Sequence, residues 1–353
     1  MLTKKRYSVK DMVLWTRKEA LSLTLYATFV TILFDVLDFS FLNLPWTPIA
    51  LIGTAVAFVI GFQNNSAYGR IWEARKIWGG IVNTSRTWGM KTMVMINNDH
   101  TENPLSEEEL YKEKKTIIHR HVAWLTALRH AMREGRSWEV FKQAKTNREW
   151  SEMIYIPEVV SSLEDELYPY LSDEERVHTM SHKNKATTLL YLQSKHINEL
   201  KDKGAIWPFA FLDLEKLLEE MFTLQGKSER IKNFPYPRQY ATLSTYFVWI
   251  FLALLPFGIV PEFEKISAHF QESYPFIASF FVWLAIPFCA VVSWVFYTME
   301  RIGRVGENPF EGSGNDVPIS TIARGIEIDI RQQLGESLDD IPKPFPEQYN
   351  VQM

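Results

Sequence analysis

Four apolar stretches occur along the chain, and a long polar segment separates the first two from the last two. The stretches cover residues 20–38, 46–68, 240–260 and 275–298, and the last three contain no charged side chain. A helix of about 20 apolar residues crosses the ~30 Å hydrocarbon core of a membrane. The pattern therefore predicts four transmembrane helices.

Lys and Arg side chains cluster before the first and third stretches and after the second and fourth. These cations are Lys4, Lys5, Arg6, Arg17, Lys18, Arg70, Arg75, Lys76, Arg230, Lys232, Arg238, Arg301 and Arg304. The two loops on the opposite side contain Lys265 as their only Lys or Arg. Since cytoplasmic loops of membrane proteins carry the excess of positive charge, both chain termini are predicted to lie in the cytoplasm.

The segments outside the four stretches have the pattern of helices. Ser8 and Asp11 form the signature of a helix start, which predicts a cytoplasmic helix within residues 1–19. Residues 69–239 contain amphipathic stretches, one of which is expected to end near Gly226. Residues 299–353 are predicted to form a cytoplasmic loop, a helix and a tail. The predicted fold class is all-α, with four transmembrane helices and a large helical cytoplasmic domain.

The second apolar stretch has three distinct faces when it is drawn as a helix. Side chains four residues apart lie on the same stripe of a helix. One stripe carries small residues, one carries mostly aromatic residues and one carries aliphatic residues. The stripes are Gly53, Ala57 and Gly61; Thr54, Phe58 and Phe62; and Ile52, Val56 and Ile60. Small residues let a neighbouring helix approach closely in lipid. From periodicity alone, the phenylalanines are expected to pack in the core of a helical bundle.

Composition fits a protein that is part membrane and part cytosolic. The 353 residues are 46% hydrophobic and 14% aromatic, and the mean hydropathy is −0.13. A net charge of −4 indicates no preference for nucleic acid, and the single cysteine, Cys289, excludes a disulfide framework and a cysteine zinc site. The chain also lacks the spacing of a nucleophile elbow, a metalloprotease helix or a kinase loop, so we do not expect an enzyme.

Two groups of residues have the composition of a metal site. Asn308, Glu311 and Asp316 lie in an acidic loop that could wrap a calcium ion with mixed oxygen ligands, or could simply cap the helix that follows. His178 and His182 have a zinc-like spacing on a helix, but no third ligand accompanies them, which favours a solvated face.

Three motifs in the chain resemble the bestrophins, and in particular the bacterial branch of that family. They are GFQNNSAYGRIWEARKIWG at the end of the second stretch, NFPYPRQY before the third and ENPFEG after the fourth. The resemblance implies a homopentameric ion channel in which five copies of the second transmembrane helix line a narrow neck. It also implies a bacterial inner-membrane location and contact with the lipid bilayer.

The neck of the family has three apolar residues at positions i, i+4 and i+8, which match Thr54, Phe58 and Phe62. The resemblance thus assigns this stripe to the pore and leaves the small stripe for helix packing. Thr54 departs from the larger apolar residue usual at its position, which predicts a wider and wetter outer ring. A match to another helix of the family places Leu212 at a second, cytoplasmic aperture.

The resemblance makes conduction of small monovalent ions the predicted function. Aromatic edges carry partial positive charge and favour anions, whereas aromatic faces favour cations, and the sequence does not fix the orientation of the rings. Of the two, we favour anions such as chloride. A monovalent-cation channel of the same fold and a membrane-anchored helical scaffold or sensor are the alternatives. No cofactor is expected. Asn308, Pro309 and Phe310 match a calcium-binding motif of some animal bestrophins, but Ser313 replaces an acidic ligand and leaves Asp316 alone.

Overall fold

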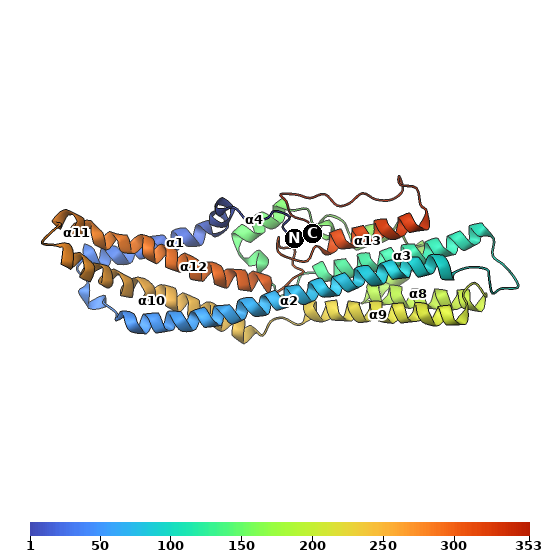
Figure 1. Ribbon diagram of the computed structural model, residues 1–353, viewed down its shortest axis with the longest axis horizontal. Coiled ribbons are helices and arrows are strands. Elements are labelled where there is room, and N and C mark those ends of the chain that lie inside the picture. Colours follow the sequence, from blue (N-terminus) through green and yellow to red (C-terminus); the bar gives the residue numbers. More distant parts are fainter.

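A single helix of 50 residues, α2 (Trp46–Met95), runs along most of the molecule and belongs to both of its halves (Figure 1). The computed structural model describes residues 1–353, except for the side chain of Phe270. Within that description the chain is helical, and its β-type pairings are isolated bridges such as the one between Leu2 and Val351. The all-α fold class predicted from the sequence is therefore confirmed.

The other long helices form two bundles placed end to end (Figure 1). Beside the first part of α2 lie α1 (Val9–Asp35), α10 (Arg238–Phe270), α11 (Pro275–Phe281) and α12 (Ala285–Gly306). Around the second part lie α3 (Glu107–Arg133), α8 (Lys185–Asp202), α9 (Pro208–Asn233) and α13 (Ile319–Leu334). The shorter helices are α4 (Lys145–Met153), α5 (Pro157–Val160), α6 (Leu163–Leu167) and α7 (Asp173–Ser181), with 3₁₀ turns at Ser40–Leu42, Phe141–Gln143 and Val282–Leu284.

Aliphatic side chains from three helices form the core of the first bundle. Val56 and Ile60 of α2 are buried in one cluster with Leu252 and Leu255 of α10, and Leu23 of α1 joins them. Because lipid tails are as apolar as these side chains, close packing rather than the hydrophobic effect holds such helices together in a membrane.

Within the part of the chain that the structure describes, the helical segments long and apolar enough to cross a membrane are Trp46–Met95, Arg238–His269 and Pro275–Gly306. The predicted first span falls short because α1 ends at Asp35 and carries Arg17, Lys18 and Glu19 just before its apolar part. Residues 20–34 remain, which correspond to about 22 Å of helix. Three of the four predicted spans thus agree with the structure in length and composition, and the first one stays a prediction.

The stretch predicted as a single helix over 275–298 is interrupted. The 3₁₀ turn Val282–Leu284 separates α11 from α12. Pro287 explains the position of this turn, because a proline has no N–H and its ring clashes with the carbonyl four residues earlier, here that of Trp283. The chain relieves the clash by tightening locally before it continues as α12.

The second bundle has a larger core that is rich in tryptophan. Trp78 and Trp88 of α2 are fully buried, and so is Trp124 of α3, whose Nε1 donates a hydrogen bond to Oε1 of Gln225 at 3.0 Å. Helix α13 packs on both α2 and α3. The helical character predicted for this half is confirmed.

Two local predictions about helix ends had opposite outcomes. Ser8 and Asp11 form the expected capping box at the start of α1. Gly226 was expected to end a helix, and that expectation is wrong, because α9 continues to Asn233. Ser228 and Ile231 beyond the glycine are buried, so packing outweighs the helix-weakening effect of glycine.

Candidate functional site

The aromatic stripe of α2 lies on the surface of the single chain. The side chains of Phe58 and Phe62 are 64% and 70% exposed, and Thr54 is exposed one turn earlier. On the other side of the same helix Val56 and Ile60 are buried. Within one chain, therefore, the phenylalanines do not pack in the bundle core, and the interpretation from periodicity alone is wrong.

The small stripe is divided between two environments. Gly53 lies against α10, where an added Cβ would come within 2.7 Å of Cε2 of Phe251. Ala57 is exposed, and an added Cβ at Gly61 would meet no atom within 4 Å. Gly53 thus permits close packing inside the chain, and the other two small residues leave the surface beside Phe58 flat.

The hydroxyl of Thr54 is turned toward its own helix. Its Oγ1 donates a hydrogen bond to the carbonyl oxygen of Ala50 at 2.9 Å. Such bonds to the carbonyl four residues earlier satisfy a hydroxyl in an apolar setting. The hydroxyl proton of Thr54 is thus engaged within the helix. Thr54 is also a smaller residue than the two phenylalanines of the stripe.

Leu212 lies in the other bundle, on α9, and is exposed. It lines a shallow cavity of about 540 Å³ between α8 and α9, together with Tyr191 and Phe222. The next residue, Asp213, forms an ion pair with Lys91 of α2. Leu212 is therefore positioned close to the second part of α2 by its neighbour, in the other bundle from the aromatic stripe.

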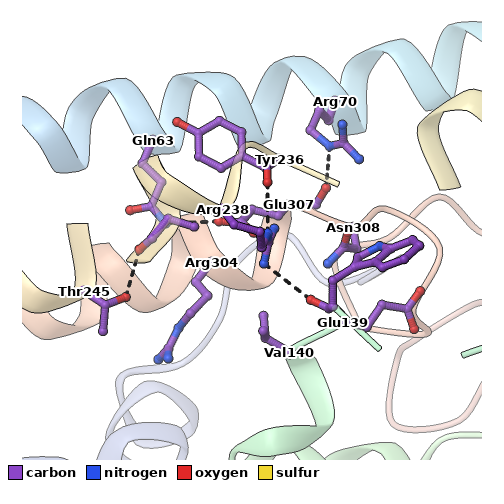
Figure 2. Close-up of polar contacts among 12 residues, drawn as sticks. Gln63, Arg70, Glu139, Val140, Tyr236, Arg238, Thr245, Arg304, Glu307 and Asn308 are labelled. Atoms are coloured by element: carbon purple, nitrogen blue, oxygen red, sulfur yellow. Dashed lines mark hydrogen bonds and ion pairs between the residues drawn. The ribbon is translucent and has the colours of Figure 1, made fainter. Parts of the chain in front are cut away.

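A buried polar junction begins at the residue after Phe62, and Figure 2 shows Gln63, Arg238 and Glu307 within it. Gln63, the neighbour of Phe62, is only 2% exposed; its Nε2 donates to Oε1 of Glu307 at 3.3 Å, and its Oε1 accepts from Oγ of Ser244 at 2.6 Å. Glu307 is 1% exposed and also forms an ion pair with Arg238 at 2.8 Å. Gln63 and Glu307 thus connect α2 with the end of α12 and the start of α10.

Arg70 strengthens the same junction about two turns further along α2. Its Nε donates to the carbonyl oxygen of Glu307 at 2.6 Å, and its Nη2 donates to the carbonyls of Ile231 and Phe234 at 2.9 and 3.0 Å. Figure 2 shows Gln63 and Arg70 both reaching from α2 toward Glu307. These bonds fix the rotation of α2 relative to α9, α10 and α12, and with it the direction in which the aromatic stripe points.

Burial dominates the electrostatics of this junction. Desolvation raises the pKa of Glu307, and the positive charges of Arg238 and Arg70 oppose the shift without cancelling it. In the loop that follows, desolvation together with the charges of Asp316 and Glu139 raises the pKa of Glu311 to about 8. The carboxyls here are thus held in an environment that favours their protonated form.

The loop after α12 does not have the donor set of a calcium site. The carboxylate of Asp316 accepts the N–H groups of Gly312 and Ser313 at 2.7 and 3.1 Å and also the hydroxyl of Ser313. The amide Nδ2 of Asn308 donates to Glu311 at 2.8 Å, and Glu311 also accepts the N–H groups of residues 140 and 141. These oxygens are engaged in closing the loop, so the residues do not fit a calcium ion.

Over the described part of the chain, no group of three or more His, Cys, Asp or Glu side chains is arranged to hold a metal ion. The rings of His178 and His182 lie 4.5 Å apart at the exposed end of α7, where Nδ1 of His182 contacts the carbonyl oxygen of His178 at 2.7 Å. Their geometry agrees with a solvated helix end.

The sequence did not predict the buried junction at Glu307. Gln63 lies 244 positions from its partner, and neither residue belongs to a recognisable catalytic or metal motif. The available signal was their place in two of the family motifs: Gln63 lies in GFQNNSAYGRIWEARKIWG, and Glu307 is the first residue of ENPFEG. The motifs did not indicate that the two side chains meet.

Comparisons with known proteins agree with this fold. A sequence profile described as "Bacterial/Fungal Bestrophin protein" matches residues 8–332, which include nearly all of the helices described above. The chain belongs to this bestrophin family. The resemblance found in the sequence is therefore confirmed.

Curated relatives of this bestrophin cover most of its length. The voltage-dependent anion channel-forming protein RSc3414 of Ralstonia nicotianae is 27% identical over 303 residues, which cover 84% of this chain and 80% of that protein. The voltage-dependent anion channel-forming protein YneE of Escherichia coli strain K12 is 24% identical over 303 residues, with coverage of 86% and 81%. These relatives are named as channel-forming proteins and not as enzymes.

Solved structures share the fold of this bestrophin. A crystal structure of a bacterial bestrophin homologue from Klebsiella pneumoniae superposes with a TM-score of 0.70 and 19% identity, covering 91% of this chain and 99% of that one. Another crystal structure of that homologue, phased with zinc, gives a TM-score of 0.69, also at 19% identity. The end-to-end arrangement of two helical bundles is thus the bestrophin fold.

Proposed function

We propose that this bestrophin assembles as a homopentamer around a central pore and conducts small monovalent anions such as chloride. The observation that carries the proposal is the exposed stripe of Thr54, Phe58 and Phe62 on an apolar helix whose opposite face, with Val56 and Ile60, is buried. The names of its curated relatives, voltage-dependent anion channel-forming proteins, support the same conclusion.

The neighbours of the stripe favour a pore over a lipid-facing surface. Phe58 and Phe62 line a shallow cavity of about 480 Å³ together with Ala57, Gly61 and Asn65. An exposed amide such as that of Asn65 is costly against lipid tails and is satisfied beside water. In a ring of identical subunits every chain presents the same stripe to the symmetry axis, so the phenylalanines form successive rings.

Rings of phenylalanine would block ions without any charged side chain, because the barrier is apolar. An apolar constriction excludes ions when it loses its water, even where its diameter would admit them. No formal charge lies between Trp46 and Phe62, so side-chain charge does not select ions at this point. Aromatic edges turned toward the axis would favour anions, and the smaller Thr54 would leave the outer ring wider and wetter.

We further propose that α1 is the fourth membrane span and that both chain termini lie in the cytoplasm of a bacterial cell. Hydrogen bonds attach α1 to its neighbours along its whole apolar part. Tyr26 donates to the carbonyl oxygen of Ala253 at 2.7 Å, Trp283 donates to Asp35 at 2.9 Å and Trp294 donates to Thr16 at 2.8 Å. These bonds join α1 to two of the candidate spans, Arg238–His269 and Pro275–Gly306, so α1 shares their environment.

Flux measurements on purified protein in liposomes test the proposal. The parent, Phe62→Ala and Phe276→Ala are compared for chloride and sodium flux. Phe276 is an equally large, exposed aromatic residue on α11 and serves as the control. We expect Phe62→Ala to raise chloride flux several-fold, because smaller side chains leave a wider constriction that loses its water less readily. The control is expected to match the parent.

Two results would contradict the proposal. If neither the parent nor Phe62→Ala conducts although both are inserted and pentameric, the channel function is wrong. If both conduct equally, Phe62 is not part of the neck. A reversal potential that follows sodium rather than chloride would show a cation channel of the same fold.

A further inference from the structure

Because α2 is unbroken from Trp46 to Met95, its helical phase can be followed from the aromatic stripe into the cytoplasmic bundle. Lys76 lies 18 residues after Phe58, which is about five turns of 3.6 residues. The two side chains therefore point in the same direction from the helix axis. At 1.5 Å per residue, Lys76 lies about 21 Å beyond Phe62.

Burial confirms that this face of α2 stays uncovered between the two positions. Asn65, Gly69, Trp72 and Lys76 are all exposed at the spacing of one helical face. Ala67, Ala74, Ile77 and Trp78, which point elsewhere, are buried against the other helices. The exposed face that begins with the phenylalanines thus continues to Lys76.

The cations on the cytoplasmic part of α2 differ in their partners. Arg86 forms an ion pair with Asp329 at 2.6 Å, and Lys91 pairs with Asp213. Arg70 is engaged by backbone carbonyls, as described above. Among the described residues, no carboxylate lies within ion-pair distance of Lys76.

The two neighbours of Lys76 do not neutralise it. Glu73 is already paired with Arg230 at 2.7 Å. Arg75 lies over the ring of Trp72, with 6.0 Å from its Cζ to the ring centroid, and points about 100° away from Lys76 around the helix. The uncovered face therefore carries one uncompensated positive charge per chain.

We propose that the Lys76 side chains line the ion path on the cytoplasmic side of the neck and raise the local concentration of anions there, so that Lys76 determines charge selectivity. This inference rests on the proposed function. Like charges arranged around a cavity with protein walls focus their field and enrich counter-ions. Since the neck itself carries no charge, selection by Lys76 takes place before an ion reaches the phenylalanine rings.

Charge substitutions at this position test the inference. Lys76→Gln, Lys76→Glu and Lys76→Arg are compared with Arg75→Gln, which removes the neighbouring charge from a different face. We expect the chloride-to-sodium permeability ratio, obtained from reversal potentials in a salt gradient, to fall several-fold in Lys76→Gln and further in Lys76→Glu. Lys76→Arg and Arg75→Gln are expected to retain the parent ratio.

Salt dependence distinguishes a field effect from a structural one. The Debye length is ~10 Å at 0.1 M and ~3 Å at 1 M ionic strength. The loss of chloride conductance in Lys76→Gln should therefore be large in dilute salt and small in concentrated salt. A loss that is the same at both concentrations would overturn the inference.

Modification after assembly covers the case in which a charge variant fails to fold. Lys76→Cys is reconstituted and then treated with a cationic or an anionic methanethiosulfonate reagent, with Arg75→Cys as the control. The native Cys289 is buried and 1% exposed, so the parent should not react. The cationic reagent should restore the parent ratio and the anionic reagent should lower it.

The failure of this inference differs from the failure of the proposed function. If chloride flux is present and Phe62→Ala alters it, while every change at Lys76 leaves the permeability ratio unchanged, Lys76 does not line the path and the channel proposal stands. If no variant conducts, the channel proposal itself fails.

Discussion

Glu311 is buried in the loop after α12 next to two other acids, and this setting makes its protonation part of the stability of the protein. Its carboxylate accepts the N–H groups of Val140 and Phe141 at 3.1 and 3.0 Å. Desolvation, Asp316 and Glu139 nevertheless raise its pKa from 4.5 to about 8. The folded chain therefore holds a proton on Glu311 under conditions where the unfolded chain has released it.

The sign of the resulting pH dependence follows from this difference. A carboxyl with a raised pKa in the folded chain contributes its full stabilisation below its unfolded pKa of 4.5 and loses it as the pH rises through about 8. We expect the melting temperature of the parent to fall as the pH is raised from about 6 to about 9. In Glu311→Gln this fall should be smaller by a few degrees. Asp316 and Glu307 also have raised pKa values, so part of the fall should remain.

Thermal unfolding in detergent across this pH range measures the effect. Glu219→Gln removes a carboxyl from an exposed position on α9 and should follow the parent curve. Parallel curves for the parent and Glu311→Gln would show that Glu311 does not titrate between these pH values.

At the scale of single elements, the small stripe of α2 separates packing within a chain from packing between chains. A methyl group at position 53 would come within 2.7 Å of Phe251, whereas one at position 61 would meet nothing within 4 Å. We therefore propose that Ala57 and Gly61 pack against the neighbouring subunit, while Gly53 packs against α10 of its own chain.

This division predicts different outcomes for two glycine substitutions. Gly53→Ala should destabilise the protein by about 1–3 kcal/mol, because it overpacks the contact with Phe251. Gly61→Ala should leave thermal stability unchanged or higher, since alanine is the better helix former. Gly61→Leu should shift the assembly toward smaller species, as measured by light scattering on size-exclusion chromatography. An intact pentamer in Gly61→Leu would exclude subunit packing at this position.

The elements of this protein were more predictable than the contacts between them. The apolar stretches and the all-α class follow from runs of residue type that are local in sequence, as does the capping box at Ser8. The junction of Gln63, Arg238 and Glu307 joins residues that are distant in sequence. Each of them lies in one of the three family motifs, but no local pattern indicates that the motifs meet. Periodicity gave three faces of α2 but no reason to choose the exposed one, because that choice depends on where α10 and α12 pack.

The end of α9 was predicted wrongly for the same reason: tertiary packing continues the helix past Gly226.

At the scale of the whole molecule, the number of membrane spans decides on which side each end of α1 lies. If α1 crosses the membrane as proposed, Lys5 before it and Phe41 after it face opposite compartments. Phe41 is 78% exposed between α1 and α2, and Lys5 is exposed as well. Because the native Cys289 is buried, cysteines introduced at these two positions report without a background signal.

Labelling with a membrane-impermeant maleimide in spheroplasts tests this topology. Phe41→Cys should react in intact spheroplasts, whereas Lys5→Cys should react only after the membrane is permeabilised. Glu102→Cys, in the exposed loop between α2 and α3, is the control on the side proposed to be cytoplasmic, and it should behave like Lys5→Cys. Reaction of Lys5→Cys and Phe41→Cys on the same side would mean that α1 does not cross the membrane.

The junction at Glu307 marks the point about which the long helix α2 would turn if it tilted as a rigid rod. The bonds of Gln63 and Arg70 hold the helix there, and the arms on the two sides are unequal. From Arg70 to Met95 the arm is about 38 Å long, and from Arg70 back to Phe58 it is about 18 Å. A rotation about this point would therefore move Phe58 about half as far as Met95. A tilt of α2 in the second bundle would reach the phenylalanines at about half its size.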